Sequence, residues 1–140
     1  MATPMRASVV WESGMRFLAH ADSGHGVVLD SPSQPGHVGA SPMELMAIAV
    51  GGCTGMDVVS ILTKMRQPLT GLEVVVEGER AEGIPKYFTA LTLTYRLRGR
   101  GLDRTKVARA VELSHSTYCS AMASLRPDCR VTSAFEIEEG

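Results

Sequence analysis

The hydrophobic pattern divides the chain into short apolar runs and one long apolar stretch. Short runs over 7–11, 16–19 and 26–30 are separated by turn-forming Gly, Ser and Asp residues, which is typical of three consecutive strands. A loop rich in Pro and Gly follows over 31–39. The pattern predicts an N-terminal three-stranded meander whose final loop leads into the long apolar stretch.

The long apolar stretch begins at Ser41 and extends to Arg66. Ser41 and Glu44 have the spacing of a capping box, and Pro42 suits the first position of a helix. No residue from Leu45 to Met56 is charged, so we expect a helix that is buried on most of its faces. This uncharged run is shorter than the roughly 18 apolar residues that a membrane-spanning helix needs, which predicts a soluble protein.

Alternation of apolar and polar residues resumes after this helix, which Gln67-Pro68 should end. It covers Leu72–Glu77 and Leu91–Arg98, and the turn residues Gly83 and Pro85 lie between the two runs. These runs predict a long hairpin whose acidic side chains face water.

The last third of the chain predicts two helices and a final strand. Asp103 is a candidate cap for a helix whose apolar stripe falls at i, i+3, i+4 and i+7 from Val107. Residues 115–119 interrupt that stripe, residues 120–125 suit a second short helix, and alternation returns over Val131–Ile137. The predicted fold is therefore α+β in the order βββ-α-ββ-αα-β, with curved antiparallel sheets around the central helix. We expect a homodimer, because so apolar a helix needs more cover than six short strands supply.

Composition and charge limit the classes of partner. The chain has 14 basic and 15 acidic side chains, interspersed along the sequence, which favours neither nucleic acid nor a membrane surface as partner. Its 140 residues suit a single domain over residues 1–140. Three cysteines are too few for a disulfide scaffold, and the N-terminal residues lack the pattern of a signal sequence. We therefore expect a cytoplasmic protein with reduced thiols.

Cys53 is the first candidate for chemistry, because it lies among glycines in the apolar helix. Each glycine weakens a helix by about 1 kcal/mol relative to alanine. The small residues could admit another backbone, a second thiol or a small substrate. Alternatively, Gly51-Gly52 breaks the helix and leaves Cys53 at a new helix N-terminus, which would lower its pKa. Cys119 also has small neighbours, and residue type alone favours packing for either cysteine.

The histidines and cysteines do not have the spacing of a metal site. The sequence contains no Cys-x-x-Cys, and His20, His25, His37 and His115 are not spaced as zinc ligands. The segment 51–55 also lacks the lysine of a phosphate-binding loop. We expect no metal and no bound cofactor.

Three segments carry a resemblance to a known family. Ser-Pro-Met-Glu-Leu over 41–45, Gly-Gly-Cys-Thr-Gly-Met-Asp-Val-Val-Ser-Ile-Leu over 51–62 and Tyr-Cys-Ser over 118–120 resemble the OsmC/Ohr family of thiol peroxidases, and most strongly its OsmC-like branch. The resemblance implies that fold over nearly the whole chain. It also implies an intertwined homodimer in which the two cysteines lie near each other at the interface.

The resemblance further implies reduction of organic hydroperoxides through a two-cysteine cycle. Cys53 would attack the peroxide as a thiolate and become a sulfenic acid, and Cys119 would resolve it as an intramolecular disulfide. An external dithiol reductant, in the family a lipoyl-bearing protein, would then restore both thiols. Cys129 matches no cysteine of the family motif and is expected to be a packing residue.

The chain departs from the family near the activating charges. The family has a glutamate directly after the proline of this motif. This chain has Met43 at that position, after Pro42, and Glu44 follows one residue later. Glu44 and Cys53 are nine residues apart, so on a continuous helix they lie about 180° from each other. Arg16 is the nearest candidate for the activating arginine of the family. Asp57 lies on the same helical face as Cys53 and would raise a thiol pKa.

Two other functions remain open from the sequence. An apolar cleft beside the central helix could hold a small lipophilic ligand, and the cysteines would then be incidental to binding. The same fold could instead serve as a redox sensor whose cysteines oxidise with little peroxidase turnover.

Overall fold

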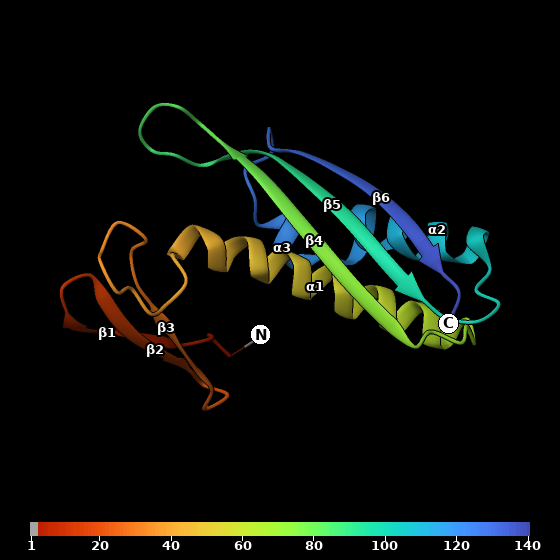
Figure 1. Cartoon of the computed structure of the whole chain (residues 1–140), viewed down its shortest axis with the longest axis horizontal. Helices are drawn as coiled ribbons and strands as arrows, with labels where there is room; N and C mark the ends of the chain where they lie inside the picture. The colour runs from red at the N-terminus through yellow and green to blue at the C-terminus, as the bar shows by residue number, and fades with distance from the viewer. Residues whose placement is uncertain (1–2) are drawn as a thin grey trace. The chain divides into compact units, whose positions relative to one another are not determined.

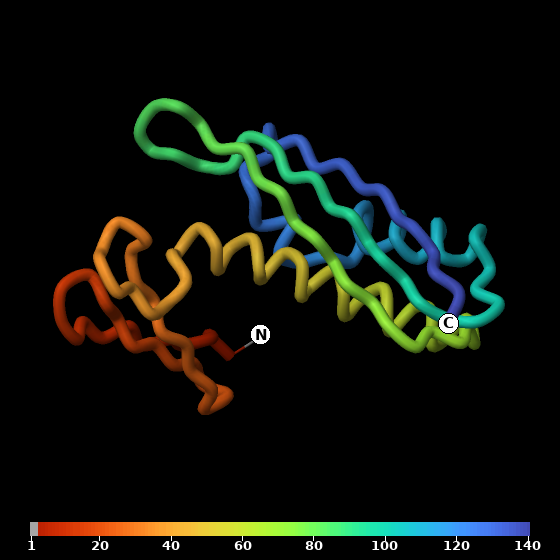
Figure 2. The backbone as a smooth tube through the Cα atoms, viewed as in Figure 1, coloured from red at the N-terminus to blue at the C-terminus, as the bar shows by residue number. Residues whose placement is uncertain are grey.

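The computed structural model describes residues 3–140, and the chain divides into two compact units after Met46 (Figures 1 and 2). The first unit contains an antiparallel sheet in the order β1-β2-β3. Its strands are β1 (Ala7–Ser13), β2 (Arg16–Ala21) and β3 (Gly26–Leu29). The predicted meander is confirmed.

Helix α1 (Pro42–Lys64) begins with the predicted capping box. The Ser41 amide donates to a Glu44 carboxylate oxygen at 2.8 Å, and the Glu44 amide donates to the Ser41 hydroxyl at 3.2 Å. The helix runs without interruption through Gly51-Gly52. The alternative in which these glycines break the helix is therefore wrong, and Cys53 lies inside a continuous helix.

The C-terminal end of α1 comes two residues earlier than the sequence pattern predicts. Arg66 has a φ of 59°, and the amide of Gln67 donates to the carbonyl of Leu62 at 2.9 Å. A residue in the left-handed conformation, followed by an amide that donates back to a carbonyl in the last helical turn, forms a Schellman motif. The motif terminates the helix at Lys64, before Pro68 is reached.

The second unit contains a sheet in the order β4-β5-β6. Its strands are β4 (Gly71–Arg80), β5 (Phe88–Arg98) and β6 (Arg130–Glu138). The predicted β4–β5 hairpin is confirmed, but β6 pairs with β5 in parallel, so the expectation of purely antiparallel sheets is wrong. A parallel pair needs a crossover connection, which here consists of α2 (Arg104–Leu113), the π-helical turn η1 (Ser114–Tyr118) and α3 (Ser120–Ala123).

The two faces of this sheet differ in polarity. On β5, the side chains that face the helices are buried, and these are Leu91, Leu93, Tyr95 and Leu97. On the opposite face, Arg96 forms ion pairs with Glu73 on β4 at 3.2 Å and with Glu136 on β6 at 3.1 Å. Both α1 and the crossover therefore cover the same face, and the other face is solvated as the alternation predicts.

Helix α1 is buried along one stripe only. Its buried residues are Val50, Gly51, Thr54, Val58 and Leu62, whereas Ile48 is 61% exposed and Met56 76% exposed. The expectation of burial on most faces is not met within one chain, because three strands and a crossover cover only one side. By length and composition alone, α1 would also be long and apolar enough to cross a membrane.

A buried polar contact joins α1 to both other layers. The Thr54 hydroxyl lies 2.7 Å from the Tyr95 hydroxyl on β5 and 2.7 Å from the Ser114 hydroxyl at the end of α2. Thr54, Tyr95 and Ser114 are each fully buried. Because no water competes for these hydroxyls, each bond is costly to leave unmade.

We expect Thr54→Val to lower the free energy of unfolding by about 1–3 kcal/mol, since it keeps the side-chain shape but leaves buried hydroxyls without a partner. Denaturant unfolding measures the change. Thr63→Val is the matched control, because the Thr63 hydroxyl is exposed and bonds only to the carbonyl of Val59, and it should cost less than about 0.5 kcal/mol. Equal stability of Thr54→Val and wild type would contradict this role for the contact.

Candidate functional site

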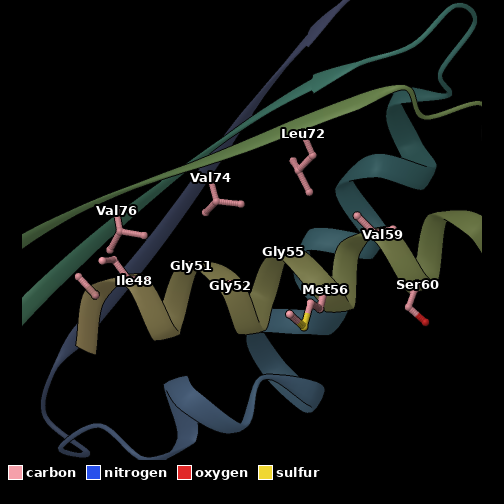
Figure 3. A pocket seen from close by; sticks show the side chains of 11 residues that line it. Ile48, Gly51, Gly52, Gly55, Met56, Val59, Ser60, Leu72, Val74 and Val76 are labelled. Atoms are coloured by element: carbon pink, nitrogen blue, oxygen red, sulfur yellow. The ribbon is translucent and has the colours of Figure 1, made fainter. Parts of the chain in front are cut away.

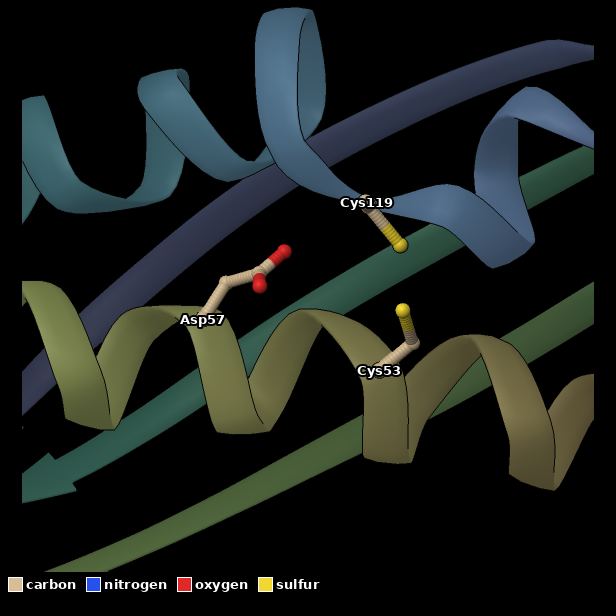
Figure 4. Close-up of side chains that lie close together, drawn as sticks. All are labelled: Cys53, Asp57 and Cys119. Carbon is tan, nitrogen blue, oxygen red and sulfur yellow. The ribbon is translucent and has the colours of Figure 1, made fainter. Parts of the chain in front are cut away.

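The structure brings Cys53, Asp57 and Cys119 together in the second unit. Their sulfur and carboxylate oxygen atoms all lie within 4.8 Å of one another. Cys53 and Asp57 are one helical turn apart on α1, and Figure 4 shows both side chains projecting from α1 toward the segment that carries Cys119. The cysteines predicted to act as a pair are therefore neighbours although they lie 66 positions apart in the sequence.

The π-helical turn η1 determines where Cys119 lies. The amide of Cys119 donates to the carbonyl of Ser114 at 2.9 Å, a bond that spans five residues instead of the four of an α-helix. Such widened turns are rare and frequently occur at functional sites. Cys119 then leaves the helical conformation, with φ −73° and ψ 102°, and becomes the N-cap of α3. The sequence pattern indicated only that the helix was interrupted here.

The two thiols have different environments. Cys119 is 4% exposed, and its sulfur accepts from the amide of Met122 at 3.4 Å. Burial raises the pKa of the Cys119 thiol to about 11, and the neighbouring Cys53 sulfur adds to the rise, while the Met122 amide opposes it. Cys53 is only partly buried. At neutral pH, Cys119 is thus a protonated thiol that can donate its S–H to the Cys53 sulfur.

Asp57 is the end point of a chain of hydroxyl groups. The Ser114 hydroxyl donates to Asp57 Oδ2 at 3.0 Å, and Ser114 has only this one proton to give. The bond between Thr54 and Ser114 must therefore be donated by Thr54, and the bond between Tyr95 and Thr54 by Tyr95. All three hydroxyls consequently orient their protons toward the Asp57 carboxylate. Burial raises the pKa of Tyr95, so this hydroxyl keeps its proton.

Sequence reasoning identified Asp57 only as a charge that would raise a thiol pKa, and it missed Thr54, Tyr95 and Ser114 as members of the site. A signal for them exists, because each places a hydroxyl at a position where the pattern requires an apolar core residue. Cys119 lies far from Cys53 and Asp57 in the sequence, which explains why the spacing of candidate metal ligands did not reveal these three residues as a group. Within residues 3–140, these three are the side chains close enough to hold a metal ion.

Arg16 and Glu44 belong to the first unit, where each has a local partner. The guanidinium of Arg16 lies 3.3 Å from a carboxylate oxygen of Asp30, which is 5% exposed. The Ser31 amide holds the pKa of Asp30 below its usual range, and Arg16 contributes to the lowering. The capping bonds from Ser41 likewise lower the pKa of Glu44. Both residues stay predictions as activating groups.

An apolar groove of about 800 Å³ runs between α1 and β4 in the second unit. Figure 3 shows Val74 and Val76 of β4 facing the helix across the groove. A Cβ added at Gly51 would meet Val76 at 3.1 Å, whereas one added at Gly52 would meet nothing within 4 Å. The first glycine therefore permits close approach of the strand, and the second leaves open space beside Cys53. Among residues 3–140, no charged side chain lines the groove, whose walls are Ala47, Ile48, Gly51, Gly52, Gly55, Met56, Val59, Ser60, Leu72, Val74 and Val76.

Comparison with known proteins assigns the chain to a family. Residues 34–134 match the family described as OsmC-like protein. Protein YhfA of Escherichia coli strain K12 is 41% identical over 133 residues, which cover 95% of this chain and 98% of the relative. A hypothetical protein from Aquifex aeolicus VF5 has a structure that is 25% identical, with a TM-score of 0.88 over 99% of each chain. The organic hydroperoxide resistance protein OhrB of Bacillus subtilis is 18% identical, with a TM-score of 0.66 over 96% of this chain and 98% of that chain, and this likeness shows the fold alone.

We expect a thiol-alkylating reagent at pH 8 to modify Cys53 much faster than Cys119, because only the thiolate reacts and the pKa of Cys119 is raised to about 11. Mass spectrometry of the alkylated peptides measures both rates. Modification of Cys119 should keep accelerating as the pH rises toward 11, since its thiolate fraction grows about tenfold per unit. Comparable rates for the two thiols at pH 8 would contradict the difference in their environments.

Proposed function

This chain belongs to the OsmC-like family, and we propose that it is a thiol-dependent peroxidase that reduces organic hydroperoxides. The observation that carries the proposal is the pair of free thiols, Cys53 and Cys119, whose sulfurs lie within 4.8 Å of each other. A disulfide needs the sulfurs at about 2.05 Å, and the turn before Cys119 and the rotatable Cys53 side chain supply the small movement. The fold that the chain shares with proteins described as organic hydroperoxide resistance proteins supports the same reaction class.

The reaction begins with the Cys53 thiolate. It attacks the terminal oxygen of the hydroperoxide, the oxygen–oxygen bond breaks, and the alcohol leaves after it takes up a proton. Cys53 is now a sulfenic acid. The Cys119 sulfur then attacks the Cys53 sulfur, a disulfide forms, and the hydroxyl group leaves as water. An external dithiol, in the family a lipoyl-bearing protein, reduces the disulfide and becomes oxidised itself, which restores both thiols.

The difference in thiol environment assigns the two roles. Cys53 is partly exposed, and the residue before it, Gly52, leaves open space at its own position. Cys119 is buried and protonated at neutral pH, and its S–H can stabilise a neighbouring thiolate by donating to it. Cys53 is therefore the attacking thiol and Cys119 the resolving thiol. A transient disulfide of this kind suits the reducing environment of the cytoplasm, where we expect the protein to work.

We also propose that Glu44 and Arg16 are the residues that activate Cys53. Met43 stands at the position of the family glutamate, and in the sequence Glu44 and Arg16 are the glutamate and the arginine nearest to the positions that the family uses. Arg16 pairs with Asp30 in the first unit. If neither Arg16 nor Glu44 activates Cys53, the chain oxidises with little turnover, which is the redox-sensor function.

We further propose that the chain forms a homodimer, with a second copy covering the groove along α1 and β4. The groove is uncharged and its residue Met56 is largely exposed, which is unusual for the surface of a soluble monomer. β4 lies at the edge of its sheet, and a second copy would bring an identical apolar surface in a two-fold arrangement. A small lipophilic ligand in the groove is the competing function.

Replacing Cys53 by Ser should abolish consumption of cumene hydroperoxide, because a serine hydroxyl does not ionise at neutral pH. Cys119→Ser should still allow one oxidation and leave Cys53 open to irreversible overoxidation. Cys129→Ser is the control and should retain wild-type turnover. Peroxide consumption and peptide mapping measure these outcomes, and wild-type protein should show a Cys53–Cys119 disulfide within one chain. Free thiols at both positions after a slight excess of hydroperoxide would show that the proposal is wrong.

We expect sedimentation velocity to show a dimer at micromolar concentration and Met56→Glu to weaken it at least tenfold, since the variant would bury an unpaired charge. Thr63→Glu changes an exposed residue of α1 that does not line the groove, and it should leave the dimer intact. A wild-type monomer would contradict the dimer. A monomer that carries a bound lipid in native mass spectrometry would favour the ligand-binding function instead.

A further inference from the structure

We propose that Asp57 is a catalytic acid–base residue, whose carboxylate takes the proton from the Cys119 thiol as that thiol attacks oxidised Cys53. The inference deepens the proposed peroxidase function and rests on its two-cysteine cycle. The observation behind it is that the Asp57 carboxylate lies within 4.8 Å of both sulfurs, beside the pair of residues between which a proton must pass (Figure 4).

The resolving step needs a proton acceptor. Cys119 is buried and its pKa is raised to about 11, so only a small fraction is thiolate at neutral pH. A thiol attacks another sulfur only after it loses its proton. Because the Cys119 sulfur is buried, bulk water cannot accept its proton directly, and a positioned side chain is the alternative proton acceptor.

Asp57 has the geometry of such an acceptor. A separation of up to 4.8 Å between the carboxylate and the Cys119 sulfur is closed by a side-chain rotation or bridged by one water. Figure 4 shows the carboxylate pointing into the space between α1 and the segment of Cys119. Asp57 also lines a cavity of about 400 Å³ together with Lys64, Leu113 and Tyr118, which gives the proton and the water product a route to solvent.

Ser114 positions the carboxylate. Its hydroxyl donates to Asp57 Oδ2 at 3.0 Å, and Ser114 in turn accepts from Thr54. Because the Ser114 hydroxyl donates to Oδ2, the hydrogen bond orients the carboxylate and leaves its other oxygen for the thiol. Ser114 is therefore a positioning residue.

The step balances without any further reactant. Cys119 gives its proton to Asp57, its sulfur forms a bond to the Cys53 sulfur, and the sulfur–oxygen bond of the sulfenic acid breaks. The leaving hydroxide takes the proton from Asp57 and departs as water. One thiol sulfur and one sulfenic acid sulfur end as a disulfide, the hydroxyl group leaves as water, and Asp57 returns to its carboxylate form.

Asp57 should affect the second step of the cycle and not the first. The attack by Cys53 does not use the Asp57 carboxylate as a proton acceptor, so Asp57→Asn should leave the first step unchanged. The second step loses its proton acceptor and should slow by about 10- to 100-fold, at or below the low end of the usual range for general base catalysis, because hydroxide can still remove the proton. A purely structural role for Asp57 would impair both steps together.

An aryl disulfide reagent measures both steps without a peroxide. Cys53 attacks the reagent and releases one coloured aryl thiolate, and Cys119 then attacks the mixed disulfide and releases a second. With reduced protein, Asp57→Asn should show a normal first release and a second release slowed 10- to 100-fold. Ser114→Ala should slow the second release less, since the carboxylate is kept but held less firmly. Asp128→Asn changes an exposed aspartate outside the cluster and should match wild type.

The pH profile of the second release distinguishes loss of the base from loss of structure. The titratable and charged groups around Asp57 are Cys53 and Lys64 of α1, Tyr118 and Cys119 of the crossover, and Tyr95 of β5 through Thr54. In Asp57→Asn, the rate should rise about tenfold per pH unit toward the Cys119 pKa of about 11. In wild type, where Asp57 accepts the Cys119 proton, the rate should depend much less on pH between 7 and 9.

The outcomes separate this inference from the proposed function. A second release in Asp57→Asn with the wild-type rate and pH profile would overturn the role of Asp57, and so would the absence of a second release in wild type. If wild type shows both releases with the predicted dependence on Asp57 but consumes no hydroperoxide, the peroxidase function fails and the acid–base role stands. Thermal unfolding of each variant shows whether it is folded. If Asp57→Asn is misfolded, the rate and the pH profile of the second release in Ser114→Ala test the role of Asp57.

Discussion

The position of the Thr54 hydroxyl constrains the rest of the second unit. This one group bonds at 2.7 Å to Tyr95 on the sheet and at 2.7 Å to Ser114 on the crossover, and all three residues are fully buried. Since buried hydroxyls are costly to leave unpaired, the helix has one favourable rotation and one depth against the sheet. Cys53 adjoins Thr54, and Cys119 follows Ser114 by one π-helical turn. The contact that fixes the core thus also fixes the distance between the thiols.

The chemistry of the thiol pair follows from unequal burial more than from nearby cations. Burial keeps Cys119 protonated, while Cys53 remains partly exposed next to a glycine that leaves space. Asp57, held by Ser114, adds a negative charge where the family resemblance implied a positive one.

Helix α1 meets two demands with one largely apolar sequence. Its buried stripe, with Gly51 approached by Val76 of β4, serves the sheet of its own chain. Its other apolar face, which includes Ile48 and Met56, is exposed. Apolar residues around a whole helix are stable in water only when a second surface covers the remaining side. The proposed homodimer supplies that surface and explains why the helix is not amphipathic.

Local interactions in the sequence determined the elements themselves. The capping box of Ser41 and Glu44, the Asp103 cap of α2, whose side chain accepts from two amides, and the alternation along β5 all depend on residues a few positions apart. The resemblance over 41–62 and 118–120 identified the cysteines. It also implied that the two thiols lie near each other. The tertiary structure alone decided that β6 runs parallel to β5 and that Asp57 accepts from Ser114. These contacts join residues that are far apart in the chain, and they form only when the sheet and both helices bury their apolar faces together, which no local pattern encodes.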